Sequence, residues 1–219
     1  RILKKIKLKF ELIKKIDKKI SECDFVVICA PLSEYEKIFS ICNKYLKKNT
    51  LVTDVGSAKK DSIEKINKIK RKDINWVSSH PIAGSEVSGP SHGNENLFID
   101  KWSVIIKQKK TSSRITKKVS KFWKLLGSRT VIMRADQHDQ IFSLTSHLPH
   151  LIAYNLILTA TSFKDSTKDN ILKFSAGGLR DFSRIAASNE VMWKDIFLSN
   201  KKNMLKVINL FIKNLKVFK

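Results

Sequence analysis

Short apolar runs alternate with amphipathic segments through the first part of the chain. Apolar runs typical of buried strands occupy residues 25–30, 50–54 and 75–79. Between them, apolar side chains recur at helical spacing over residues 34–47 and 60–70. Strands that alternate with helices in this way predict a parallel sheet covered by helices.

The same alternation continues for one more round. Residues 103–106 and 129–133 are the next strand-like runs, and residues 113–126 between them have the spacing of a helix. Gly127 stands directly after that helix, where a glycine commonly ends one. The first part of the chain is therefore predicted to be an α/β domain.

The pattern changes after Asp136, where strand-like runs stop. Apolar residues recur only at helical spacing, over residues 141–163, 171–174, 191–198 and 204–218. The fold class predicted is α/β then all-α, with domains at 1–134 and 135–219. A cleft between two such domains is a natural place for a ligand.

Two polar side chains follow predicted strands of the first domain. Ser57 lies in Asp-Val-Gly-Ser-Ala-Lys after one strand, and His80 lies in Ser-His-Pro-Ile-Ala-Gly after the next. Ligands of open α/β sheets bind outside the carboxyl ends of the strands. Ser57 and His80 are therefore candidates for one shared site.

The formal net charge of +23 comes mostly from lysines scattered along the chain. A scattered distribution indicates a general compositional bias more than a nucleic-acid-binding patch, although the charge favours anionic ligands. No apolar run approaches the ~20 residues of a membrane helix, and no signal peptide opens the chain.

Cys23, Cys29 and Cys42 form no Cys-x-x-Cys pair, which disfavours a disulfide framework or a zinc site. They fit a reducing cytoplasm. The five histidines show no His-x-x-x-His pair, so no metal site is predicted.

The helical part has two polar clusters of its own. His147 and His150 flank Pro149, which bends a helix and frees a carbonyl, and so they could face a ligand or simply lie on the helix surface. Arg180 and Arg184 follow a predicted turn at Gly177 and Gly178; one could bind a carboxylate, or both could be surface residues beside a capping loop.

Six segments, in order, resemble the prephenate dehydrogenase family of tyrosine biosynthesis, including its arogenate dehydrogenases. They are Cys-Ala-Pro at 29–31, Asp-Val-Gly-Ser-Ala-Lys at 54–59, Ser-His-Pro-Ile-Ala-Gly-Ser-Glu at 79–86, Ser-His-Leu-Pro-His at 146–150, residues 177–186, and Met-Trp-Lys-Asp-Ile at 192–196. Each segment is short, but their shared order across both predicted domains is specific.

The resemblance implies an oxidative decarboxylation of prephenate to 4-hydroxyphenylpyruvate, with NAD or NADP accepting a hydride. His80 would be the catalytic proton acceptor, since a neutral imidazole suits this task near neutral pH. Ser57 would orient His80 or the substrate hydroxyl. His147 and Arg184 would bind the two carboxylates of the substrate.

The resemblance also implies a Rossmann-like cofactor domain and a helical dimerisation domain that forms a homodimer. Ala30, Pro31 and Gly56 are the residues it assigns to the cofactor. The Gly-x-Gly-x-x-Gly turn that holds a pyrophosphate does not occur in the sequence, so the expectation is a chain that lacks its first strand, turn and helix. No acidic or basic residue that would select NAD or NADP through the ribose 2′ position is identified after a second strand.

Several alternatives stay open at this point. Arogenate could replace prephenate as the substrate, or the chain could be another two-domain dehydrogenase such as a β-hydroxyacid dehydrogenase or an imino-acid reductase. It could also be a catalytically degenerate family member, or a basic, non-catalytic nucleic-acid-binding module.

Overall fold

The computed structural model describes residues 11, 13–84, 89–109, 111–167 and 171–219. The chain forms two compact units, Arg1–His138 and Asp139–Lys219. The division falls within helix α4 (Ala135–Phe142), and the sequence-based boundary after residue 134 lies at the start of that helix.

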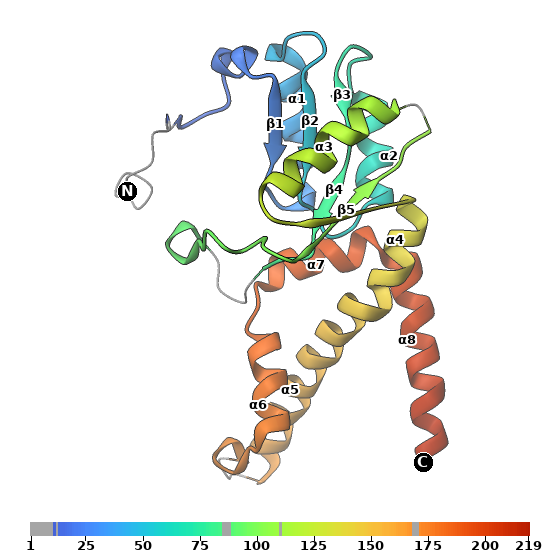
Figure 1. The fold of residues 1–219 in the computed structure, drawn as a ribbon. Helices are drawn as coiled ribbons and strands as arrows, with labels where there is room; N and C mark the ends of the chain where they lie inside the picture. Colours follow the sequence, from blue (N-terminus) through green and yellow to red (C-terminus); the bar gives the residue numbers. More distant parts are fainter. Residues whose placement is uncertain (1–10, 12, 85–88, 110, 168–170) are drawn as a thin grey trace. The chain divides into compact units, whose positions relative to one another are not determined.

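The first unit holds a parallel three-stranded sheet in the order β1-β2-β3 (Figure 1). The strands are β1 (Phe25–Ile28), β2 (Leu51–Asp54) and β3 (Asn75–Trp76). Phe25 pairs with Leu51 and Ile28 with Asp54, so that β1 and β2 end at the same edge. The predicted parallel arrangement is confirmed for these strands.

A second three-stranded sheet has the order β4-β5-β6. Its strands are β4 (Ser79–Pro81), β5 (Trp102–Ile106) and β6 (Arg129–Met133). The pair β5–β6 is parallel, whereas β4–β5 is antiparallel, which the sequence pattern did not predict.

The single strand predicted over residues 75–79 is in fact divided between the two sheets. The Val77 amide still donates to Val52 of β2, but the Ser78 carbonyl accepts from Ile106 of β5. One residue later the Ser79 amide donates to the Asp54 carboxylate, at 3.1 Å. A side-chain acceptor therefore takes the place of the next backbone partner, and the chain leaves the first sheet.

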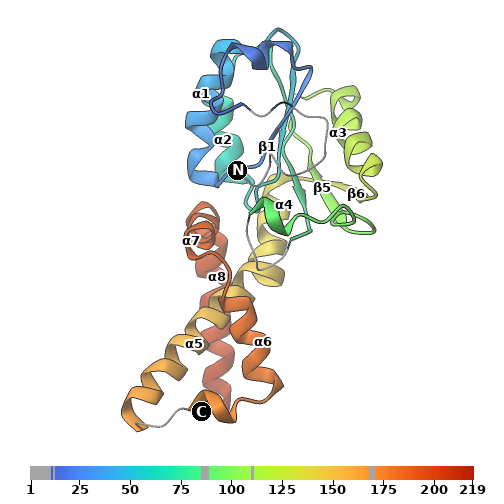
Figure 2. The ribbon, with the colours of Figure 1, turned by 90° about the vertical axis from the view of Figure 1, so that its left-hand side faces the viewer.

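Helices cover both faces of these strands. Figure 2 shows α1 (Tyr35–Tyr45) and α2 (Lys60–Ile69) on one side and α3 (Ser113–Leu125) on the other. All three match predicted helices with ends that differ by a few residues. Short 3-10 turns occupy Lys18–Glu22, Leu32–Glu34 and Pro90–His92.

Two hydrophobic cores follow from this layering. Successive strand residues point to opposite faces of a sheet, so Val52 packs with Phe39 and Trp76 under α1 and α2. Its neighbour Leu51 packs instead with Val119 and Trp123 of α3. Because helices cover both faces, all four residues of β2 are buried, with no alternation between buried and exposed positions.

The second unit is helical throughout the part that the structure describes. It contains the end of α4, α5 (Leu148–Thr167), α6 (Gly177–Ala186), α7 (Glu190–Ser199) and α8 (Lys201–Leu215), with 3-10 turns at Ile171–Phe174 and Lys216–Phe218. A π-helical segment, Ser143–His147, joins α4 to α5 and ends two residues before Pro149. The glycine turn predicted at Gly177–Gly178 is wrong, because these residues are the first two of α6.

Among the described residues, one helical stretch, Ala135–Phe163, is long and apolar enough to cross a membrane by length and composition alone. The prediction from the sequence that no such stretch occurs is wrong. Only 22% of its most apolar window is buried within the chain. Its exposed apolar side chains include Leu144, Leu158 and Phe163.

Candidate functional site

The loops after β1 and β2 leave the sheet at the same edge, because Ile28 and Asp54 are register partners. The first loop carries Ala30 and Pro31, and the second carries Gly56 and Ser57. Pro31 is exposed, while Ala30 and Ser57 are partly buried. The sequence-based candidates for cofactor binding and the candidate Ser57 thus share one edge.

Gly56 is buried, and its lack of a side chain has an internal explanation. A Cβ there would lie 2.7 Å from both Leu32 Cδ2 and Tyr35 Oη. The Gly56 amide donates to Asp54 Oδ2, at 3.0 Å. Glycine at this position lets the loop after β2 pack tightly against the start of α1.

Asp54 and Lys59 bracket that loop with a buried ion pair. Lys59 Nζ lies 2.6 Å from Asp54 Oδ2, and both side chains are wholly buried. Asp54 Oδ2 also accepts the Tyr35 hydroxyl at 3.0 Å. Burial, together with the nearby Asp54 carboxylate, raises the pKa of the Tyr35 phenol, which keeps this hydroxyl a donor.

Lys59 also links the Ser57 loop to the strand that carries His80. Its ammonium donates to Ser78 Oγ at 3.0 Å and to the Ser79 carbonyl at 2.7 Å. Ser79 Oγ accepts the Trp123 indole N–H at 2.9 Å, which holds the same backbone from the α3 side. The hydrogen bond from Lys59 to Ser79 thus links the two candidate residues. Ser57 lies two residues before Lys59, and His80 lies one residue after Ser79.

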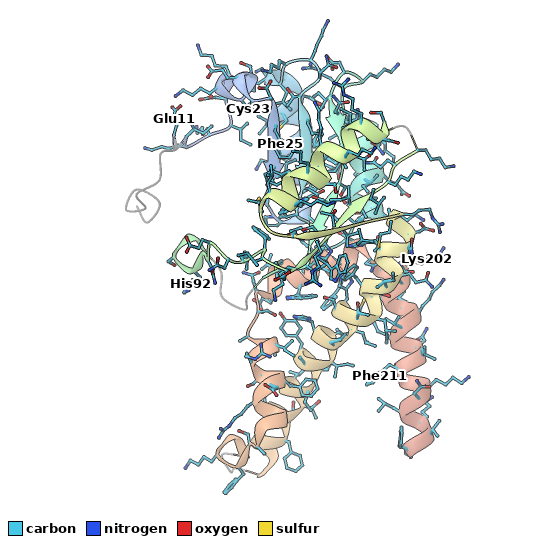
Figure 3. All side chains as sticks on the ribbon, viewed as in Figure 1. Glu11, Cys23, Phe25, His92, Lys202 and Phe211 are labelled. Atoms are coloured by element: carbon cyan, nitrogen blue, oxygen red, sulfur yellow. The ribbon has the colours of Figure 1, made fainter. Side chains whose placement is uncertain are left out.

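His80 is 7% exposed and contacts a second buried histidine of the same unit. Its Nδ1 lies 2.8 Å from Nε2 of His138, which is wholly buried near the start of α4. The ring centroids are 5.0 Å apart at an interplanar angle of 63°. In contrast, His92 is exposed on the turn Pro90–His92, where Figure 3 labels it.

In the second unit, His147 is wholly buried at the end of the π-helical segment. Its Nδ1 lies 3.2 Å from Asn200 Nδ2, which also donates to the Asp139 carbonyl at 2.7 Å. An amide N–H can only donate, so His147 Nδ1 is the acceptor and its ring proton lies on Nε2.

His150 is the more accessible imidazole of this cluster. It is partly buried and stacks on Trp193, with centroids 3.6 Å apart and planes inclined by 21°. Its Nδ1 lies 3.0 Å from the Ser146 carbonyl. Nδ1 is therefore the protonated donor, which leaves the lone pair of a neutral His150 on Nε2.

Arg180 and Arg184 are both exposed on α6. The two guanidinium groups are one helical turn apart, because four residues separate them. His80 and Ser57 belong to the first unit, and His147 and Arg184 belong to the second.

Sequence reasoning missed the partners that hold these side chains. His138 had been considered only as a metal ligand, and Asn200 and Lys59 had been given no role. Lys59 could have been found, since a lysine five residues after a strand-ending aspartate is a candidate buried partner. The His80–His138 contact spans 58 positions and has no local signal.

The described residues contain no cluster of three or more metal-ligating side chains. A groove of about 480 Å³ lies at the amino ends of β1 and β2, opposite the candidate residues of the first unit. In the second unit, a groove of about 290 Å³ is lined by Tyr154, Trp193 and Phe197 with their α7 neighbours.

Two helix-covered, mainly parallel sheets with polar side chains at the carboxyl edge of the first, followed by a helical unit, have the architecture of a nucleotide-binding domain joined to a helical domain. Residues 2–132 match the family described as prephenate dehydrogenase, nucleotide-binding domain. Residues 134–219 match prephenate dehydrogenase, dimerization domain. The chain belongs to the prephenate dehydrogenase family.

Individual relatives agree with this assignment. The chain is 34% identical to the cyclohexadienyl dehydrogenase of Zymomonas mobilis over 197 residues, which are 90% of this chain and 67% of the relative. It is 29% identical to the prephenate dehydrogenase of Bacillus subtilis, over 85% of this chain and 50% of the relative. The chain thus spans between half and two thirds of these curated relatives.

A solved structure extends the agreement to three dimensions. The crystal structure of prephenate dehydrogenase from A. aeolicus, in complex with hydroxyphenyl propionate and NAD+, superposes with a TM-score of 0.86 at 34% identity. The match covers 93% of this chain and 71% of that one. The predicted fold class, a parallel-sheet nucleotide-binding domain followed by a helical dimerization domain, is confirmed.

Proposed function

We propose that the protein containing this chain catalyses the oxidative decarboxylation of prephenate to 4-hydroxyphenylpyruvate with NAD or NADP. Arogenate, which carries an amino group in place of the side-chain keto group, is the alternative substrate. The observation that carries the proposal is the buried His80, whose strand is linked to the loop of Ser57 by the hydrogen bond from Lys59 to the Ser79 carbonyl. Both domains of the family match the chain.

His80 would take the proton of the ring hydroxyl. The carbinol C–H bond gives up a hydride, and the C–C bond to the ring carboxylate breaks, leaving its electron pair in the ring as carbon dioxide departs. The hydroxyl proton passes to His80 and returns to the phenolate oxygen, so atoms and charge balance. Ser57 would hold the hydroxyl or the imidazole in line, since orientation alone supplies several kcal/mol.

Arg184 and an imidazole of the second unit would bind the two carboxylates. Exposure of the Arg184 guanidinium supports this role, because its planar fork can donate two hydrogen bonds to a carboxylate. His147 is the imidazole that the resemblance assigns to this role. Because its Nδ1 accepts from Asn200, its ring proton lies on Nε2, and this N–H is a donor that a carboxylate could accept.

The carboxyl edge of β1 and β2 is where a dinucleotide would lie. The exposed Pro31 and the partly buried Ala30 offer an apolar border there, and Gly56 keeps the adjoining loop close to the sheet. These residues fit the nicotinamide end of NAD or NADP, and no Gly-x-Gly-x-x-Gly turn for the pyrophosphate occurs in the chain. When bound, the oxidised nicotinamide would supply the hydride acceptor.

A homodimer formed by the helical unit is part of the proposal. The stretch Ala135–Phe163 exposes apolar side chains, and so do α7 and α8, with Leu198, Leu205 and Leu210 among them. Exposed apolar faces of this extent commonly mark an interface. A second copy would cover them, which accounts for the apolar helix without a membrane.

The proposed partner is a small-molecule substrate, with no role for nucleic acid or membrane. The free cysteines Cys23, Cys29 and Cys42 support a cytoplasmic protein.

The decisive assay is NAD(P)H formation from prephenate and from arogenate, measured with the complete gene product and with this 219-residue chain. We expect His80→Asn to lose activity by about 100-fold or more, because a general acid–base group contributes roughly 10²–10⁴-fold. His92→Asn, at an exposed histidine, is the matched control and should retain full activity. Inactivity of the complete protein with both substrates and both cofactors would contradict the proposal.

A further inference from the structure

His80 and His138 are both buried, and their ring nitrogens are within hydrogen-bond distance of each other. We propose that His138 is a positioning residue that fixes the tautomer and the ring orientation of His80. This inference rests on the proposed function only in so far as His80 is the proton acceptor. The contact itself is a property of the first unit.

The distance allows one hydrogen bond with one shared proton. His80 Nδ1 and His138 Nε2 are 2.8 Å apart, so one of these nitrogens must donate and the other accept. If both presented lone pairs, or both presented protons, they would repel each other at this separation. The pair therefore exists in one of two complementary tautomeric arrangements.

Only one arrangement leaves His80 able to take a proton from a substrate. If His138 donates to Nδ1, a neutral His80 carries its proton on Nε2 and has no lone pair left to accept another. If His80 donates from Nδ1, its lone pair lies on Nε2, where it can accept a hydroxyl proton. A proton acceptor at position 80 therefore requires His138 to be the hydrogen-bond acceptor, with the proton of its own ring on Nδ1.

The fold holds the two imidazole rings next to each other. His80 pairs with Val104 in the β4–β5 ladder, and β5 pairs with β6. The chain leaves β6 at Met133 and starts α4 at Ala135, and the His138 amide donates to the Arg134 carbonyl at 2.9 Å. Two sheet ladders and one helical turn thus place His138 against His80 with little freedom.

A neutral acceptor has a chemical advantage in this position. Many catalytic histidines are oriented by a carboxylate, which adds a negative charge beside the ring. A substrate with two carboxylates would be repelled by that charge. His138 can accept the Nδ1–H bond of His80 and stabilise the imidazolium that forms, without placing an anion in the site.

The first test reads the tautomer directly and does not depend on activity. The protein is labelled with 15N-histidine, and the His80 ring signals are assigned among five histidines by their loss in His80→Asn. We expect protonated Nδ1 and unprotonated Nε2 in the wild type. His138→Leu should shift His80 toward a mixture of tautomers, and His138→Gln, whose side-chain oxygen can accept the same hydrogen bond, should preserve the wild-type pattern.

The second test measures kcat and KM with the complete gene product. We expect kcat to fall about 100-fold in His138→Leu with little change in KM, which is the scale of a misplaced catalytic group. His138→Gln should recover most of that loss, and the control His92→Leu should change neither constant. Thermal unfolding of each variant separates a loss of fold from a loss of positioning.

The outcomes distinguish the two proposals. A folded His138→Leu variant with unchanged tautomer and kcat overturns the role of His138 and leaves the proposed function intact. A wild-type His80 protonated on Nε2 overturns both the role of His138 and the assignment of His80 as the proton acceptor. Equal losses in His138→Gln and His138→Leu, accompanied by equal losses of thermal stability, overturn it as well. An inactive wild type with the expected tautomer shift refutes the proposed function but supports the positioning of His80.

Discussion

Lys59 and Asp54 form an ion pair in which neither side chain touches solvent, with 2.6 Å between Nζ and Oδ2. Two buried charges are tolerated only when their remaining hydrogen-bonding capacity is met. Here the ammonium also reaches Ser78 and Ser79, and the carboxylate accepts from Tyr35 and Gly56. The pair joins the end of β2, the start of α2 and the strand of His80.

Replacing Lys59 by Met should destabilise the protein strongly. The variant leaves the Asp54 carboxylate buried without its cation, which typically costs about 3–5 kcal/mol. The control Lys65→Met breaks an exposed helical ion pair with Asp61 and should cost about 0–1 kcal/mol. Urea unfolding of both variants gives the comparison. Equal midpoints would show that the buried ion pair stabilises the protein no more than the exposed one.

Gly56→Ala should disturb the loop of Ser57. The new Cβ would meet Leu32 Cδ2 and Tyr35 Oη at 2.7 Å, and Tyr35 cannot move without loosening its bond to Asp54. Overpacking of this kind costs about 1–3 kcal/mol. Gly84→Ala is the matched control, because no atom lies within 4 Å of its added Cβ.

The effect is measured as a shift of the thermal midpoint and as the activity of the complete protein. We expect Gly56→Ala to lower both and Gly84→Ala to change neither appreciably. A Gly56→Ala variant with the wild-type midpoint would mean that Leu32 and Tyr35 give way freely.

The sequence pattern predicted most elements of the fold because burial on both faces leaves long apolar runs. It failed where side chains replace backbone partners. The strand at 75–79 divides because Asp54 captures the Ser79 amide, and that event depends on a residue more than twenty positions earlier. The antiparallel β4–β5 pair follows from this division.

The candidate site shows the same limit. Motifs revealed His80, Ser57 and the imidazoles at 147 and 150, since their order along the chain is recognisable. The partners of these residues are set by tertiary contacts, as with His138 at 58 positions and Asn200 at 53 positions from the side chains they hold. The burial of His147 could not be predicted either, because a histidine within an apolar helix can point toward the core or toward solvent.

Asn200→Ala should loosen the junction between α7 and α8. Asn200 lies between these helices, and its amide serves both the Asp139 carbonyl and His147 Nδ1. Each buried acceptor left without a donor costs about 1–3 kcal/mol. We expect faster hydrogen exchange of α7 and α8 amides in this variant, measured by mass spectrometry, and no such change for Asn214→Ala at an exposed position of α8. Unchanged exchange in Asn200→Ala would argue that the Asn200 contacts are dispensable.

Alkaline pH should weaken the folded state partly through Cys42. This thiol is 2% exposed in the core between α1 and the sheet, and burial raises its pKa from 9.0 to about 11. Between these values the unfolded chain releases the thiol proton while the folded protein keeps it, so the unfolded state binds fewer protons. The free energy of unfolding therefore falls as pH rises through this window, and the contribution of Cys42 is fully present below pH 9.

The contribution is isolated by comparison with Cys42→Ala. Tyr35, whose pKa is also raised by burial, is present in both proteins, and its effect cancels. We expect the stability difference between wild type and Cys42→Ala to shrink as the pH is raised from 9 to 11 in a series of urea titrations. Parallel curves for Cys42→Ala would show that the Cys42 thiol ionises equally in the folded and unfolded states.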